Sequence, residues 1–420
     1  MKTGFKRATA PLALFMLAAS LSACGDGDAG SDSKKVTVWM YPVIADPKAS
    51  AAYWDGIEKA FEKAAPGTSL TIEQQPWENR DQKIATAFGG GKGPDVVLLT
   101  PDQIPQFSAN GAIRPVDGAL KDSAGKFLPA TMDAMKQDGK IYGAPIYQTI
   151  TTTIYNKKLL TQAGITTPPA TWDEIKAAAP KLKQKGVALL DYSASNEASL
   201  NLNFYPLLWQ AGGTVFAKDG KKVAFNSPEG VEALTFLTDL YKAGSVPKSS
   251  MTNTNLLADQ ALGKQQAAMG FSVVLADAEL AAKTWGNENV VVGAPLKGPA
   301  REVAFGIPGA LSVNAKSKNT AGAEKFLAFM TAPEQIQSLG KASGYFSPRT
   351  DVSVPNASPY AKQYQAALSN VSPGEPNPAA RQLMGLLAPE IQAALLGKKS
   401  PKDALDDAAK AADDLLARQR

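Results

Sequence analysis

The chain has 420 residues, and its 44 Lys and Arg against 39 Asp and Glu give a formal net charge of +5 at pH 7. It contains no histidine and a single cysteine, Cys24. These counts exclude Ser-His-Asp and Cys-His catalytic arrangements, histidine zinc sites, disulfides within the chain and clusters of thiolate ligands. The length predicts two domains.

The N-terminus has the pattern of an export signal. Lys2, Lys6 and Arg7 form a basic start without acids, and residues 8–21 are uncharged and mostly apolar. This apolar segment is too short to span a bilayer as a stable helix but has the proportions of a signal-peptide core. The rest of the chain is close to neutral and has no stripe of Lys and Arg interleaved with aromatic residues, so we expect no nucleic-acid partner.

The apolar segment ends in Leu21-Ser22-Ala23-Cys24, which resembles a lipobox, where a peptidase cuts before a cysteine that is then lipidated. We therefore predict a lipoprotein signal peptide at residues 1–23 and a lipid such as palmitate on Cys24. This lipid would hold the protein at the extracytoplasmic face of the cell membrane. The alternative is an ordinary secretory signal followed by a chance cysteine. Residues 24–34 are small and polar, which predicts a flexible tether.

Strands and helices alternate in the first part of the body. Residues 35–39 and 70–73 read as strands, and the apolar run 95–99 predicts a strand that is buried on both faces. The apolar residues of segments 54–65 and 79–88 recur at helical spacing. This alternation predicts a mostly parallel sheet with helical crossovers.

The remainder of the chain repeats the alternation. Residues 141–155 read as a strand, and residues 171–184 as a helix opened by a capping box between Thr171 and Glu174. Further helices are expected at 203–211, 229–243, 256–267, 320–331, 359–368, 379–397 and 401–417, and further strands at 290–292 and 310–313. The chain is therefore predicted to be an α/β protein with two lobes.

Several short motifs carry a resemblance to a known family. The most specific are Tyr155-Asn156-Lys157 and, after it, Pro168-Pro169-Ala170-Thr171-Trp172-Asp173-Glu174. Weaker ones are Gly93-Pro94-Asp95-Val96, Ala163-Gly164-Ile165, Gly212-Gly213, Gln266-Ala267-Ala268-Met269, Phe326-Leu327 and the segment 397–405. In this order, and after a lipobox, they resemble the extracellular solute-binding proteins of carbohydrate ABC importers, the group that contains maltose-binding protein.

The resemblance implies a type II periplasmic-binding-protein-like fold, with a mostly parallel sheet flanked by helices in each lobe and a ligand cleft between the lobes. The first lobe would comprise residues 35–148 plus 309–350, and the second residues 149–308 plus 351–420. A sugar, as a di- or oligosaccharide, would bind with high affinity by hinge closure and be delivered to the permease of an ABC importer. We expect a monomer with no enzymatic activity, no cofactor and no metal.

The carboxyl ends of parallel strands meet at one edge of a sheet, where α/β proteins bind ligands. Trp39 and Tyr41 follow the first strand, and Asp102 and Gln103 follow the strand at 95–99, so we expect both groups at the cleft. The two aromatic rings are candidates for stacking on a sugar. By the resemblance, Asp102 occupies the position of a carboxylate that binds sugar hydroxyls; otherwise it would cap the helix that follows.

Further candidates come from the resemblance. Gln148 lies near a family acid, Tyr205 and Trp209 precede the Gly212-Gly213 motif, and Phe271 lies near a family tryptophan. A glycine-aromatic-proline-arginine turn supplies Tyr345, Phe346 and Arg349, of which Arg349 either binds hydroxyls or forms a structural ion pair. The family's tryptophan and arginine beside the acid correspond to Leu99 and Gln103, and a C-terminal tryptophan corresponds to Met384. These departures argue against assuming a maltodextrin ligand.

Three other readings stay open at this point. The same fold could carry a non-sugar solute, such as glycerol phosphate, a polyamine or a metal chelate. A secreted glycosidase would need two carboxylates across one sugar subsite, and Asp102 has no evident partner in the sequence. A purely structural surface lipoprotein is the third reading.

Overall fold

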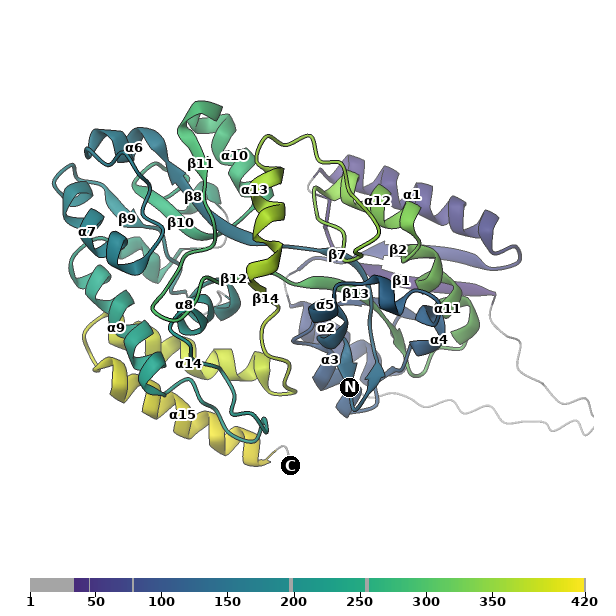
Figure 1. Cartoon of the computed structure of the whole chain (residues 1–420). Coiled ribbons are helices and arrows are strands. Elements are labelled where there is room, and N and C mark those ends of the chain that lie inside the picture. The colour runs from purple at the N-terminus through teal and green to yellow at the C-terminus, as the bar shows by residue number, and fades with distance from the viewer. Residues whose placement is uncertain (1–33, 45, 78, 196–198, 254–256, 419–420) are drawn as a thin grey trace, which may run out of the picture.

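The structure, a computed structural model, describes residues 34–44, 46–77, 79–195, 199–253 and 257–418. The predicted signal peptide, Cys24 and the tether as far as residue 33 lie outside the described residues. The chain forms two lobes joined by strands that pass from one lobe to the other (Figure 1). Each lobe has its own hydrophobic core around its own sheet. The predicted two-lobed α/β fold is therefore confirmed.

The first lobe is built on a six-stranded mixed sheet. Its strands lie in the order β2 (Ser69–Gln74), β1 (Lys35–Met40), β3 (Val96–Leu99), β13 (Pro308–Asn314) and β4 (Ile113–Arg114), and β7 (Ala144–Gln148) also pairs with β13. Strand β1 is parallel to β2 and β3, whereas β13 is antiparallel to its neighbours. All four residues of β3 are buried, as its apolar sequence predicts for a central strand.

Helices cover this first sheet. They are α1 (Pro47–Ala64), α2 (Arg80–Gly89), α3 (Ile104–Ala109), α4 (Asp117–Leu120), α5 (Pro129–Asp133), α11 (Thr320–Met330) and α12 (Pro333–Ser343), with a small hairpin of β5 (Lys136–Gln137) and β6 (Lys140–Ile141). Helix α1 begins where the Asp46 carboxylate accepts a hydrogen bond from the Ala49 N–H at 2.7 Å. Its Trp54, Ile57 and Phe61 recur at helical spacing and are buried in the core.

The second lobe has a four-stranded sheet in the order β11 (Val290–Val292), β8 (Thr151–Asn156), β10 (Ala267–Val274) and β9 (Ala188–Leu190). Its helices are α6 (Lys157–Gln162), α7 (Trp172–Lys183), α8 (Phe204–Gln210), α9 (Pro228–Lys242), α10 (Leu275–Trp285), α13 (Ala361–Ala366), α14 (Ala380–Leu395) and α15 (Pro401–Arg418). The capping box predicted at Thr171 and Glu174 is present at the start of α7. None of the helices in the described part of the chain combines the length and the apolar character that crossing a membrane requires.

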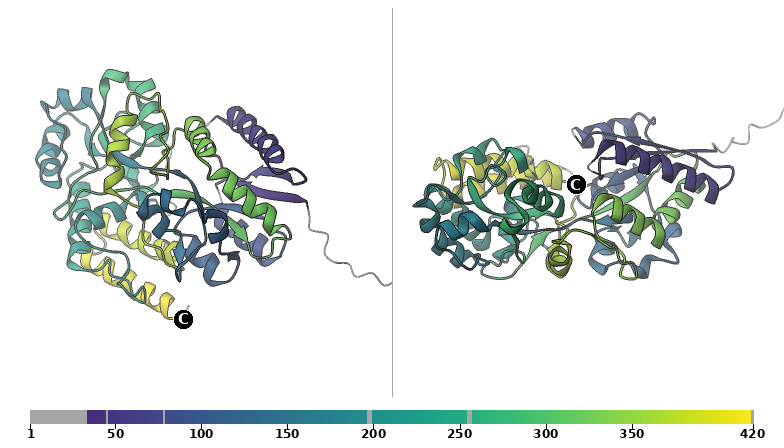
Figure 2. Two further views of the ribbon diagram at one scale, coloured as in Figure 1. Left: turned by 45° about the vertical axis from the view of Figure 1, so that its right-hand side comes forward. Right: turned by 90° about the horizontal axis from the view of Figure 1, so that it is seen from above.

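Two connections between the lobes join consecutive strands, and a third runs from Val352 in the first lobe to α13 in the second. Residues 149–150 separate β7 in the first sheet from β8 in the second, and residues 306–307 separate β12 (Ala304–Phe305) from β13. The two connections are bonded to each other, because the Thr149 N–H donates to the Ile307 carbonyl at 2.8 Å. Strand β12 also pairs with β14 (Val371–Ser372), which leads into α14. Seen from above, the two lobes lie side by side (Figure 2).

Some details differ from the sequence-based expectation. Neither sheet is mostly parallel in its strand pairs, because β13 is antiparallel to its three neighbours in the first sheet and β8 is antiparallel to both β10 and β11 in the second. The described part of the expected helix at 256–267 is not helical throughout: a short 3-10 turn at Leu257–Asp259 is followed by tight turns and then by β10. A Cβ on Gly263 would lie 2.0 Å from the Leu257 carbonyl oxygen, so only glycine fits this turn. Val352, two residues after the expected end of the first lobe, packs against the core of that lobe.

Candidate functional site

A cavity of about 630 Å³ lies where the carboxyl ends of β2 and β3 face the second lobe. Both lobes contribute to its wall, which consists of Trp77, Asn79, Arg80, Asp81, Gln82, Thr100, Asp102, Tyr147, Thr149, Ser199, Asn201, Leu202, Phe305, Ile307, Tyr345 and Arg381. The volume is in the range of small-molecule sites. The wall combines aromatic rings with carboxylates, guanidinium groups, amides and hydroxyls.

Trp77 forms an exposed aromatic face of the cavity. It lies just after β2, and its ring stacks on Tyr41 with the centroids 4.8 Å apart. Tyr41 is fully buried, whereas 43% of Trp77 is exposed, so Tyr41 supports the indole from behind. The Arg80 guanidinium lies 5.1 Å from the Trp77 ring centroid and 5.4 Å from that of Tyr41, which adds cation–π contacts to the stack. The stack and the cation–π contacts hold the indole in place, while much of Trp77 stays exposed.

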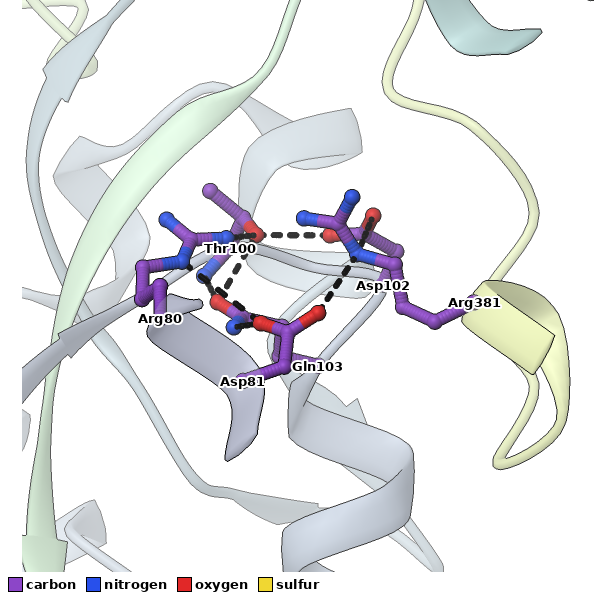
Figure 3. Close-up of polar contacts among 6 residues, drawn as sticks. All are labelled: Arg80, Asp81, Thr100, Asp102, Gln103 and Arg381. Carbon is purple, nitrogen blue, oxygen red and sulfur yellow. Dashed lines mark hydrogen bonds and ion pairs between the residues drawn. The ribbon is translucent and has the colours of Figure 1, made fainter. Parts of the chain in front are cut away.

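Arg80 anchors a polar network below this ring. The Arg80 Nη2 donates to the Thr100 Oγ1 at 3.2 Å, and the Thr100 hydroxyl donates to the Asp102 Oδ1 at 2.6 Å (Figure 3). The Thr100 N–H donates to the Gln103 Oε1 at 3.0 Å, and the Gln103 amide donates to Asp81. The start of α2 and the loop after β3 are thus held together by side chains.

A second arginine reaches this network from the other lobe. Arg381 lies in the first turn of α14, and its Nε is 2.9 Å from the Asp102 Oδ2 and 3.5 Å from the Asp81 Oδ2 (Figure 3). Burial lowers the pKa of Arg80, the positive charge of Arg381 lowers it further, and Asp81 and Asp102 oppose this shift. A guanidinium nevertheless stays protonated, so two cations and two carboxylates balance one another at the cavity.

Two tyrosines close another side of the cavity. The rings of Tyr147 on β7 and Tyr345 after α12 lie with their centroids 4.8 Å apart. Burial raises the pKa of both phenols, so both hydroxyls are neutral at physiological pH. The cavity therefore offers flat apolar faces beside hydrogen-bonding groups of fixed orientation. This arrangement can hold a polar ligand that has apolar faces.

The structure brings only some of the predicted site residues to this cavity. Asp102 and Tyr345 line it. Gln103 and Tyr41 lie directly behind the wall, where they support Thr100 and Trp77. Trp39 lies elsewhere on the first lobe, where its Nε1 donates to the Glu73 Oε2 at 2.9 Å.

Two more predicted residues of the first lobe lie away from the cavity. Gln148, at the end of β7, accepts a hydrogen bond from the Thr131 hydroxyl at 3.1 Å. Arg349 forms an ion pair with Asp351 at 2.8 Å and donates to the Thr331 carbonyl at 2.7 Å, so the structure contains the ion pair that was one of its two expected roles. Both side chains are buried.

The remaining predicted residues pack in or beside the second lobe. Tyr205 is buried in its core, and the Trp209 Nε1 donates to the Glu375 Oε1 at 3.0 Å. Phe271 stacks on Tyr192, also in that core. Phe346 is buried against α10 and the connection between the lobes.

Sequence reasoning did not find Trp77, Arg80, Asp81 or Arg381. The signal for the first three was available, because residues 75–81 follow the strand at 70–73 just as Asp102 follows its own strand. Arg381 comes from the far end of the chain, and only the packing of α14 onto the second lobe brings it to the cavity.

A polar and aromatic cavity between two lobes is a place where a small solute can bind. The chain belongs to the bacterial extracellular solute-binding protein family, whose model matches residues 45–337. The members of this family are binding components of transport systems and not enzymes.

Individual relatives agree with this family assignment. The chain is 26% identical to a putative binding protein of Brucella abortus, over 94% of this chain and 96% of the relative. It is also 26% identical to the maltotriose-binding protein of Pyrococcus abyssi, over 51% of this chain and 43% of the relative. The fold matches the GacH receptor of Streptomyces glaucescens, solved unliganded and with acarbose, with a TM-score of 0.77 and 24% identity, covering 91% of this chain and 98% of that receptor.

Proposed function

We propose that this protein binds a di- or oligosaccharide in the cavity between its lobes. The observation that carries the proposal is the exposed ring of Trp77 beside the network of Arg80, Asp81, Asp102 and Arg381. A sugar presents C–H patches that suit a flat aromatic face, and paired hydroxyls that suit planar carboxylate and guanidinium groups. The maltotriose bound by one relative and the acarbose bound by GacH support this substrate class.

The charge balance of the cavity favours a sugar over the other solutes. A phosphate ligand calls for unpaired cationic groups, and a polyamine calls for unpaired acids. At this cavity the two arginines lie next to two carboxylates, so neither sign is in excess. An uncharged ligand preserves this balance.

We further propose that the bound sugar closes the two lobes around the connections at residues 149–150 and 306–307, and that the closed form delivers the sugar to an ABC permease. Residues 35–148 plus 309–350 and residues 149–308 plus 351–420 would be the main moving bodies. Because the sugar would contact both lobes only when they are closed, it would stabilise the closed form by its difference in affinity. A lipid on Cys24 would keep the monomeric protein beside the permease.

A thermal-shift screen tests the substrate class. Malto- and chitooligosaccharides form the test set, with glycerol phosphates, spermidine and metal chelates as the comparison set. A ligand at 100 times its Kd adds about 2.7 kcal/mol to the free energy of unfolding, which is a rise of a few degrees in Tm. We expect the rise with a saccharide. A rise only with the comparison set would overturn the sugar assignment and keep the solute-binding family.

A further inference from the structure

Arg381 holds an unusual position, because it belongs to one lobe and contacts the acids of the other. Helix α14, which carries it, packs through Leu383, Leu387 and Ile391 into the core of the second lobe. Asp81 and Asp102 belong to the first lobe. Among the ion pairs between described residues, those of Arg381 alone join the two lobes.

The contact has charge attraction but no aligned hydrogen bond. The Arg381 Nε is 2.9 Å from the Asp102 Oδ2, yet within the described structure this N–H has no hydrogen-bond partner. Arg381 is about one third exposed and Asp81 is more exposed still. An ion pair of this kind is weak and is screened by salt. It can therefore form and break as the lobes move.

Contacts within the first lobe orient the Asp102 carboxylate towards Arg381. Its Oδ1 accepts a hydrogen bond from the Thr100 hydroxyl, which leaves Oδ2 directed towards Arg381. Its side chain is largely buried, so the carboxylate has little water to compensate its charge once the cavity closes. Opening the lobes would return Arg381 to solvent and leave Asp102 with its own lobe.

We propose that Arg381 is an electrostatic latch between the lobes, which raises the closed population of the protein before any ligand binds. The latch acts through Asp81 and Asp102 together, and it does not depend on which solute the cavity accepts. Because a partly exposed ion pair shifts an equilibrium by only about two- to fivefold, the latch biases closure without locking it.

Small-angle X-ray scattering of the ligand-free protein tests the latch. We expect Arg381→Met to increase the radius of gyration at low salt. The wild type should expand when salt rises from about 0.01 M to about 1 M, because the Debye length falls from about 30 Å to about 3 Å. Arg381→Met should not respond to salt. Lys402→Met is the matched control, since it removes an ion pair with Asp406 inside α15 and should leave the wild-type behaviour intact.

A double-mutant cycle separates the latch from a general loss of charge. In the Asp81→Asn/Asp102→Asn background, the change Arg381→Met should have a much smaller effect on the radius of gyration. Equal radii for wild type and Arg381→Met at both salt concentrations would overturn the proposal, and so would an undiminished effect in the double-asparagine background. The measurement uses no ligand, so a failure of the sugar assignment would leave its result unaffected.

Discussion

At the scale of single residues, the cavity separates side chains that can contact a ligand from those that hold them. Trp77, Asp102 and Arg381 line the cavity, while Tyr41 and Gln103 lie behind it. Substituting a residue of the first group should therefore weaken binding through lost contacts with the ligand. Substituting Tyr41 or Gln103 should weaken binding only if it displaces a residue of the first group.

Replacing Asp102 by Asn tests the proposed contact with a hydroxyl. A hydrogen bond to a charged group contributes about 1.5–3 kcal/mol, so the Kd for the saccharide should rise about tenfold or more. Asp133→Asn is the control, because that carboxylate forms an exposed ion pair with Lys136 on the same lobe. Calorimetric titration of the two variants provides the comparison. Equal affinities would contradict a role of Asp102 in binding.

Asp191, after β9, gives the protein a pH dependence unrelated to the cavity. Burial raises its pKa from 3.8 to about 7, against the effect of backbone hydrogen bonds. Between these values the folded protein keeps a proton that the unfolded chain has lost, so stability decreases as the pH rises from about 4 to about 7. Asp191→Asn should therefore gain Tm relative to the wild type across this range. A difference that stays constant from pH 4 to pH 8 would contradict the prediction.

At the scale of elements, the segment between β14 and α14 determines where Arg381 lies. Glu375 fixes this segment, because its carboxylate accepts hydrogen bonds from the Trp209 Nε1 at 3.0 Å, the Val215 N–H at 2.8 Å and the Phe216 N–H at 2.9 Å. Trp209, predicted as a ligand contact, thus takes part in holding the element that carries Arg381.

Glu375→Ala should destabilise the protein, because it leaves three donors without their acceptor. Each buried unsatisfied donor costs about 1–3 kcal/mol, and partial access to water reduces the sum, so we expect a loss of about 3 kcal/mol. Denaturant unfolding measures it. The control is Glu232→Ala on the exposed face of α9, where a change within about 0.5 kcal/mol is expected. Equal losses in both variants would argue against the role of Glu375.

The elements also show how far the sequence predicts this protein. Helices with clear local signals, such as α7 with its capping box and α9 with Ser227 at its N-cap, lie within a residue or two of their expected bounds. Strand β10 was not predicted, and the helix expected at 256–267 overlaps it only at Ala267, because the central position of β10 in the sheet depends on partners distant in sequence. The residues of the site also divide into those with a local sequence signal and those placed by tertiary packing. Asp102 follows a recognisable strand, whereas Arg381 reaches the cavity through tertiary packing alone.

At the scale of the whole molecule, the proposed function depends on an equilibrium between open and closed lobes. The cavity is complete only when Arg381 and Asn201 of the second lobe face Trp77 and Asp102 of the first. A sugar bound there should reduce the radius of gyration at saturation, most visibly in Arg381→Met, whose lobes we expect to be more open. An unchanged radius with saturating saccharide would contradict closure on binding.

The most direct test of sugar binding in this cavity is a calorimetric titration of wild type and Trp77→Ala with the saccharide that raises the Tm most. Trp77 is chosen because its exposed ring is the feature on which the sugar proposal rests, and Trp39→Ala is the matched control. We predict one site per chain in the wild type, unchanged binding in Trp39→Ala, and a Kd at least about tenfold higher in Trp77→Ala, as expected for losing an aromatic contact of about 1.5 kcal/mol. Equal affinity in all three proteins would contradict sugar binding against Trp77 in this cavity.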